Sequence, residues 1–141
     1  MAWAARHLRG RFLPIADRPP VAFPPASFDV AVANSVFTHL EEARQRGWLE
    51  ELHRLLRPGG LLIVTTFGPH RIGMVPNLTE ERRAELERRG FLFVPGPGPF
   101  NQNAAFHSRT FLESDWQPLF RLHDFRADGM AGFQDLSVWG A

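Results

Sequence analysis

The sequence of 141 residues contains no cysteine, no lysine and no tyrosine. Without cysteine there is no disulfide, no thiolate nucleophile and no cysteine zinc site. Without lysine and tyrosine there is no Schiff-base lysine, no Walker lysine and no tyrosine general acid. Long apolar runs are also missing, since residues 61–64 and their neighbours fall far short of the roughly 18 residues of a membrane-spanning helix. These absences favour a soluble protein in a reducing, cytoplasmic setting.

An excess of charge of one sign is absent too. The 16 basic and 15 acidic residues give a formal net charge of +1, which gives no field that would attract nucleic acid or an anionic membrane. Histidines are the strong metal-ligand candidates that remain, but His70, His107 and His123 have no metal-ligand spacing, so we expect no metal site. Hydrophobic residues are abundant at 44%, including 13 Phe. That content suffices for one core, and we expect a single domain over residues 1–141.

The first third of the chain predicts a short helix and two strands. Residues 1–14 carry three arginines and no acid, as a transit peptide does, but lack its serines. We favour a helix over residues 2–8, closed by Gly10, and a strand over residues 11–16. Residues 28–33 are nearly all apolar and small or β-branched, which predicts a central parallel strand covered on both faces.

A helix and a second strand follow. Apolar residues at helical spacing predict a helix over residues 41–56, with Glu51 and Arg54 among the side chains that face water. The paired Glu50 and Glu51 are interpreted as helix-surface charge, because neighbouring residues diverge around a helix. The helix is expected to stop at Arg57-Pro58-Gly59-Gly60, and residues 61–67 form a buried strand. Strand, helix and strand make a right-handed βαβ unit.

The second half predicts fewer regular elements. We expect loops over residues 68–77 and 101–105, and a helix from about Thr79 to Arg89. Ser108 is expected to cap a short helix that ends at Trp116. Residues 119–126 and 133–139 alternate as strands about a glycine-rich turn, which predicts a terminal antiparallel hairpin. The pattern as a whole indicates an α/β sheet with a hairpin at one edge.

The segment from Phe23 to Phe67 resembles class I S-adenosylmethionine-dependent methyltransferases. The resemblance rests on Pro-Pro-Ala-Ser-Phe-Asp before the first strand and, most specifically, on Leu-Leu-Arg-Pro-Gly-Gly after the helix, at residues 55–60. Residues 106–109 and 132–136 are similar to the bacterial small-molecule branch called type 11 or type 12. The resemblance implies a partial Rossmann-like methyltransferase sheet, mostly parallel with a C-terminal antiparallel hairpin, and S-adenosyl-L-methionine as cofactor.

Two parts of that family's pattern are not found. The family carries a glycine-rich loop after its first strand and an acid at the end of its second, and the sequence has neither. We therefore expect a domain that is N-terminally truncated relative to the family. Two functions stay open: methyl transfer to a small-molecule oxygen or nitrogen acceptor, by this chain or by an enzyme of which it is the C-terminal part; or a non-catalytic module acting by association or complementation. For the second, a homodimer through an exposed sheet edge is the expected partner arrangement.

The resemblance also implies which residues hold the cofactor. Asp17 falls where the family has an acid that accepts a hydrogen bond from the adenine amino group, although it could simply start the turn into Pro19 and Pro20. Asn34, Ser35, Val36 and Phe37 directly follow the strand of residues 28–33, where open α/β sheets bind ligands. The alternative is a polar capping turn with Phe37 in the core.

Three polar residues and a group of phenylalanines are candidates for binding or activating the methyl acceptor. His39 and His107 are candidate general bases, because imidazole changes its charge near neutral pH; the alternatives are helix capping for His39 and packing for His107. Arg109 could orient an anionic or hydroxylated acceptor. Phe106 belongs to a series that could line an apolar acceptor pocket or form ordinary core: Phe91, Phe93, Phe100, Phe106 and Phe111.

Overall fold

The computed structural model of the chain describes residues 2–98 and 102–141. It has two sheets. The larger sheet contains β1 (Phe28–Ala33), β2 (Leu56–Thr66), β6 (Gln134–Gly140) and β5 (Arg121–Met130), in that order. The smaller sheet pairs β3 (Phe91–Val94) with β4 (Ala104–His107). The helices are α1 (Ala2–His7), α2 (Glu42–Leu55), α3 (Glu80–Arg89) and α4 (Arg109–Trp116), with short 3₁₀ turns η1 (Phe37–His39) and η2 (Pro69–Met74). No helix of the described residues is long and apolar enough to cross a membrane.

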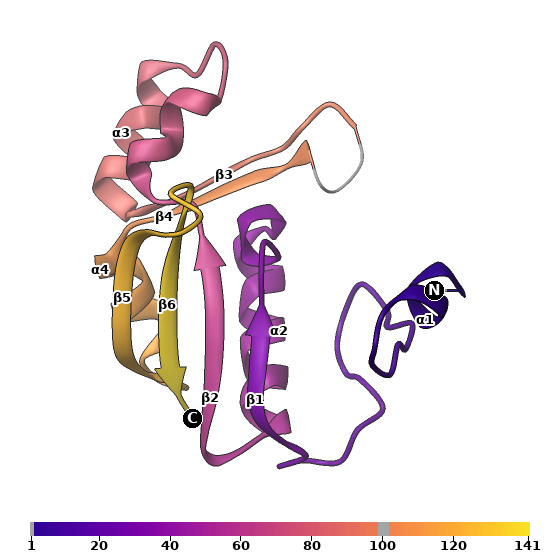
Figure 1. The fold of residues 1–141 in the computed structure, drawn as a ribbon. Helices are drawn as coiled ribbons and strands as arrows, with labels where there is room; N and C mark the ends of the chain where they lie inside the picture. Colours follow the sequence, from indigo (N-terminus) through magenta and orange to yellow (C-terminus); the bar gives the residue numbers. More distant parts are fainter. Residues whose placement is uncertain (1, 99–101) are drawn as a thin grey trace.

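The larger sheet is mixed. β1 and β2 are parallel and are connected through α2, and β6 pairs antiparallel with both β2 and β5. The expected βαβ unit and the terminal hairpin are therefore both confirmed, and the parallel part is confined to one strand pair. Figure 1 shows α2 and α4 behind this sheet, and no helix of the described residues covers its front face.

The main core lies between the sheet and these two helices. Leu62 and Val64 of β2 point into it, together with Leu49 of α2. Trp116 of α4 and Trp139 of β6 lie against each other there, with ring centroids 5.1 Å apart, and both are fully buried. The opposite face of the sheet carries Val30 and Val32, which are 48% and 66% exposed.

Three expectations about the first third are wrong. Residues 11–16 form no strand, and the segment leading to β1 is an irregular arm with prolines at positions 14, 19, 20, 24 and 25. Proline has no backbone N–H to donate to a ladder, so this segment is a poor strand former. As a result β1 lies at the edge of the described sheet, where a central strand covered on both faces was expected. Gly10 does not cap α1 either, because the helix ends at His7.

The arm is fastened to α2 by a side chain that was expected to face water. Glu51 is 5% exposed and accepts hydrogen bonds from the backbone N–H of Val21 at 2.8 Å and from Arg54. Arg54 also donates to the carbonyl oxygen of Phe23 at 2.9 Å. The Arg54 guanidinium holds the pKa of Glu51 below its usual range. The surface-charge interpretation of Glu51 is therefore wrong, because its carboxylate satisfies donors of the arm.

The Arg-Pro-Gly-Gly motif forms a bulge at the start of β2. Phe28 pairs with Leu56 and Val30 pairs with Leu61, so the intervening residues 57–60 project from the ladder. Gly59 has a φ of +78°, but it lies within β2 and does not cap α2, whose C-cap residue Leu56 is extended. A Cβ on Gly60 would lie 3.1 Å from the carbonyl oxygen of Asp29 and 2.9 Å from that of Arg57. The motif thus lets the two strands approach closely.

The smaller sheet was not expected. Residues 91–94 received no strand assignment, and Ala104 and Ala105 were assigned to a loop, but these segments pair as β3 and β4; Asn101 of that expected loop lies outside the described residues. The expected loop over residues 68–77 contains η2. The helix after Thr79 is confirmed as α3, and Ser108 caps α4 as expected by accepting a hydrogen bond from the backbone N–H of Phe111 at 3.1 Å.

Candidate functional site

The carboxyl ends of β1 and β2 meet a braced turn of residues 34–36. The backbone N–H of Ser35 donates to Thr65 Oγ1 at 2.8 Å, and the Thr65 hydroxyl donates to Asn34 Oδ1 at 3.3 Å. From β6, Gln134 Nε2 donates to Ser35 Oγ at 3.0 Å. Ser35 has a φ of +55°, a left-handed conformation that is uncommon for a residue with a side chain. Three strands therefore hold a strained turn where α/β sheets bind ligands.

A cavity of about 630 Å³ opens beside this turn. Val36 and Phe37 line it together with Val32 of β1, and Ile15 and Asp17 of the arm form another part of its wall. Its lining is otherwise largely apolar, from α2 and from Leu40. Three of the five residues expected to hold the cofactor thus share one cavity, while Asn34 and Ser35 form the adjoining turn.

Asp17 lies at the polar rim of this cavity. Its side chain is 73% exposed, and its carboxylate lies 3.5 Å from the guanidinium of Arg44 on α2, which also lines the cavity. In the described part of the chain, these are the two charged residues of the lining. The cavity therefore fits a flat, largely apolar ring system that presents an N–H donor to Asp17. Among the described residues, its lining offers no second carboxylate that could bind a ribose diol.

His39 lies on the other side of η1. It lines a second cavity, of about 400 Å³, whereas Phe37 of the same turn lines the first. His39 Nδ1 lies 2.7 Å from the carbonyl oxygen of Asn103. A carbonyl oxygen can only accept, so Nδ1 carries the hydrogen and the lone pair of the neutral ring is on Nε2. That tautomer leaves Nε2 as the basic nitrogen.

His107 lies in β4 and is fully buried. Gln45 uses its side-chain N–H groups on the carbonyl oxygens of Phe37 and Leu40, so its Oε1 faces His107 Nε2, 2.9 Å away, and accepts from it. Burial lowers the pKa of His107 to about 3, so the ring is neutral. The imidazole therefore braces η1 through Gln45, and it lines none of the cavities described above.

The two residues that were expected to bind the methyl acceptor, Arg109 and Phe106, also lie away from these cavities. Arg109, at the start of α4, donates to Glu113 at 2.8 Å and lies over the Phe125 ring. Phe106 is fully buried, and its ring lies 5.9 Å from that of Phe67, which does line the second cavity. Of the remaining phenylalanines, Phe91 is buried, and Phe100 lies outside the described residues.

Two polar residues of the site were missed from the sequence. Thr65 and Gln134 brace the turn at residues 34–36, as described above. A usable signal existed for Thr65, because Thr65 and Thr66 are polar residues at the end of an otherwise apolar strand. Gln134 gives no comparable signal, because it is 99 residues from Ser35 in sequence. Only the antiparallel return of β6 beside β2 brings them together.

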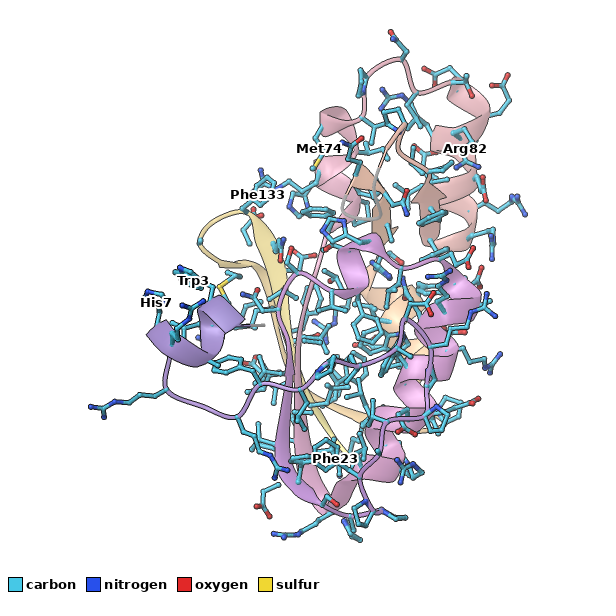
Figure 2. All side chains as sticks on the ribbon, turned by 90° about the vertical axis from the view of Figure 1, so that its right-hand side faces the viewer. Trp3, His7, Phe23, Met74, Arg82 and Phe133 are labelled. Atoms are coloured by element: carbon cyan, nitrogen blue, oxygen red, sulfur yellow. The ribbon has the colours of Figure 1, made fainter. Side chains whose placement is uncertain are left out.

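A cluster of His70, Asp128 and Asp135 also escaped the spacing argument. Their ligand-type atoms lie within 4.8 Å of one another. Arg71 donates to Asp128 Oδ1 at 2.5 Å, and Arg71 and His70 together hold the pKa of Asp128 below its usual range. Burial raises the pKa of Asp135. Because the guanidinium already balances Asp128, we interpret the cluster as a clamp between η2 and the turn of the β5–β6 hairpin, whose tip carries Phe133 near Met74 in Figure 2.

Part of the sequence matches known methyltransferases. Residues 3–64 match the type 11 family described as a methyltransferase domain. A curated relative, the malonyl-[acyl-carrier protein] O-methyltransferase of a Paenibacillus species, is 46% identical over 50 residues, which are 36% of this chain and 17% of the relative.

Solved structures share the fold over almost the whole chain. A protein from Pyrococcus horikoshii is 16% identical with a TM-score of 0.66, and the match covers 99% of this chain and 63% of that one. The 1,6-didemethyltoxoflavin-N1-methyltransferase of Burkholderia thailandensis, solved with S-adenosylhomocysteine, is 17% identical with a TM-score of 0.64, covering 99% of this chain and 54% of that one. The chain therefore spans less than two thirds of the length of each of these proteins.

Proposed function

The chain has the fold of the class I S-adenosylmethionine-dependent methyltransferases, and from this premise we propose that it takes part in methyl transfer from S-adenosyl-L-methionine to an oxygen or nitrogen of a small molecule. The observation that carries the proposal is the cavity beside the strained turn at the end of β1. It gathers Asp17, Val36 and Phe37 at the end of the sheet where α/β proteins bind ligands.

The residues of this cavity suit one end of the cofactor. The apolar walls at Ile15 and Val36 would pack on the faces of an adenine ring, and the Asp17 carboxylate would accept a hydrogen bond from its amino group. Thr65 and Gln134 would keep the adjoining turn, Asn34 and Ser35, in place against the rest of the cofactor. The lining lacks a second acid for the ribose, so we expect the described residues to supply only part of the cofactor's contacts.

The chemical demands on the protein are small. A sulfonium methyl group is already activated, so holding the acceptor in line supplies most of the rate. His39 is positioned to help, because its Nδ1–H donates to the carbonyl oxygen of Asn103 and its Nε2 can take a proton from an acceptor O–H or N–H. His107 and Gln45 act one step away, because Gln45 holds the carbonyl oxygens of Phe37 in η1 and of Leu40 just after it.

Calorimetric titration with S-adenosylhomocysteine tests the cofactor role. We expect Asp17→Ala to weaken binding by about tenfold, the effect of losing one hydrogen bond to a charged acceptor. Asp29→Ala is a matched control, because Asp29 is equally exposed but lies at the far end of β1. Equal affinity of the Asp17→Ala and Asp29→Ala variants would contradict the placement of adenine at Asp17.

A second function, association with another polypeptide, is favoured by the uncovered side of the sheet. Val30 and Val32 lie at the outer edge and on the helix-free face, and Ile15 of the arm is 61% exposed nearby. Exposed apolar strand edges pair with other chains. In this second proposal a segment of a partner chain adds to β1 and completes the layer between β1 and the arm, or two copies pair through this edge.

A further inference from the structure

The second cavity, beside His39, has a lining unlike that of the first. It lies between the end of β2, the η2 segment and the β3–β4 hairpin, and Phe67, Val75 and Val94 line it. Its volume of about 400 Å³ lies within the usual range of small-molecule sites. It lies across η1 from the first cavity, so under the proposed function it would hold the molecule that receives the methyl group.

The lining carries almost no charge. Prolines at positions 76, 95 and 97 add further apolar surface, and in the described part of the chain His39 is the one titratable side chain among the lining residues. No guanidinium of the described lining is present to balance a carboxylate or phosphate. An anion would lose its hydration there without gaining a partner, which is costly.

The β3–β4 hairpin forms the roof of this cavity, and it is hydrogen-bonded to His39. Asn103 accepts from His39 with its backbone oxygen, and its side-chain Oδ1 accepts from the backbone N–H of Gly96 at 2.9 Å. One residue therefore joins both arms of the hairpin to the imidazole. Below it, Phe106 supports Phe67, and His107 ties β4 to η1 through Gln45. The roof, the aromatic wall and His39 form a connected unit.

We propose that this cavity binds a neutral aromatic alcohol of one or two rings, with the ring against Phe67 and the hydroxyl group toward His39. The inference rests on the proposed methyl transfer and narrows its acceptor class. Phe67 and the rigid proline rings suit a flat apolar body, and the imidazole is the group of the lining that can take a hydroxyl proton. Asn103 is the positioning residue that keeps the roof and His39 in register.

Phenol and benzoate distinguish this proposal from a general apolar site. In NMR titrations of the full chain, we expect phenol to shift the backbone signals of Val75, Val94 and Ala104, with a dissociation constant about tenfold or more below that of benzoate. Equal affinity for the two compounds, or shifts confined to residues outside this cavity, would overturn the proposal.

A filled cavity gives a second readout. Ala104→Leu places extra volume in the cavity and should abolish the phenol shifts, whereas Ala43→Leu makes the same change at an exposed residue of α2 that lines neither this cavity nor the first cavity beside the turn at residues 34–36. If Ala104→Leu binds phenol as the unaltered chain does, the site is wrong. If Ala104→Leu does not fold, the comparison of phenol with benzoate on the unaltered chain decides.

The cofactor titration is independent of these measurements. Phenol binding without S-adenosylhomocysteine binding would support the cavity assignment and count against the proposed function. S-Adenosylhomocysteine binding without phenol binding would overturn the acceptor class and leave the proposed function standing. Asn103→Ala should weaken phenol binding and shift the His39 ring signals while leaving S-adenosylhomocysteine affinity unchanged, a pattern that a general loss of folding would not give.

Discussion

At the scale of single residues, the two histidines near η1 show how environment sets chemistry. His39 in η1 binds the backbone oxygen of Asn103, just before β4. His107 in β4 binds Gln45 of α2, which in turn holds η1. His39 lines a cavity. His107 is enclosed among Phe91, Phe111 and Gln45 and stays neutral. The same side chain is therefore a candidate base at one position and a packing group at the other.

Burial of His107 predicts acid sensitivity. Its pKa in the folded protein is about 3, below the ordinary value of 6.5, so between these pH values the unfolded chain binds the proton and the folded chain does not. The free energy of unfolding should therefore fall as pH drops through this window, by at most roughly 1.4 kcal/mol per pH unit, and be independent of this group above it. Urea unfolding at several pH values measures the slope.

The His107→Gln variant serves as the comparison for that slope. Removing the titrating ring should flatten the pH dependence by the same amount, whatever the variant's absolute stability. An unchanged slope in His107→Gln would mean that other groups cause the acid sensitivity.

Glu51 predicts a local effect on the arm. Glu51→Gln removes the charged acceptor for Val21 and Arg54, so we expect a loss of about 1–3 kcal/mol in unfolding free energy and faster proteolysis within residues 17–25. Glu50→Gln makes the same change on the exposed neighbour and should stay within about 0.5 kcal/mol of the parent. Similar losses in both variants would argue against the fastening of the arm by Glu51.

At the scale of elements, the junction of α2 with β2 depends on two glycines for different reasons. Gly59 supplies a left-handed φ, and the backbone N–H of Gly59 donates to the carbonyl oxygen of Ala141 at 3.0 Å. Gly60 supplies space, because a side chain there would press on the backbone of Asp29 and Arg57. The bulge thereby links the parallel strand β1 and the C-terminal strand β6 to the same point of β2.

Alanine substitutions separate these two reasons. Gly60→Ala should destabilise the chain by about 1–3 kcal/mol through overpacking, and Gly59→Ala by about 1 kcal/mol through its backbone conformation. Gly73→Ala is the control, because a Cβ there meets nothing within 4 Å and its φ is not positive. Thermal or urea unfolding of the three variants gives the ranking, and a Gly60→Ala variant as stable as Gly73→Ala would refute the close approach.

At the scale of the whole molecule, the sheet has one covered face and one open edge. Helices α2 and α4 bury the core side, while the arm runs past β1 without pairing with it, with Trp3 and His7 on α1 at one end and Phe23 at the other (Figure 2). Phe23 contacts Phe28 edge to face, with ring centroids 5.1 Å apart. The space between β1 and the arm is the first cavity, which lies where both proposed functions meet.

The open edge of β1 predicts self-association, and we expect a charge placed on this strand to suppress it. Val32→Lys places a cation on the edge strand, so we expect a smaller oligomeric fraction in sedimentation velocity than for the parent chain. Leu8→Lys is the control, because Leu8 is also apolar and exposed but follows α1 on the arm. A parent chain that is monomeric at all concentrations would rule out pairing of two copies and leave a different partner as the remaining form of the association proposal.

The sequence by itself determined the local elements of this protein. Apolar runs with the right periods predict β1, α2, β2 and the β5–β6 hairpin, and Ser108 predicts the cap of α4, because these signals depend on a few neighbouring residues. The Arg-Pro-Gly-Gly motif likewise predicts where α2 ends. The sequence also predicts a turn at residues 34–37 as a ligand site, because α/β sheets bind ligands where a parallel strand ends, and that site stays a prediction.

Only the tertiary structure decided which residues face a cavity and which lie inside. Glu51 was predicted to face water and is buried, because its partner Val21 comes from an arm about 30 residues earlier in the chain, as does Phe23, which binds the neighbouring Arg54. β3 and β4 are too short for a periodic signal and form because they pair with each other. The separate environments of His39 and His107, and the edge position of β1, follow from contacts between distant segments, which local sequence patterns do not encode.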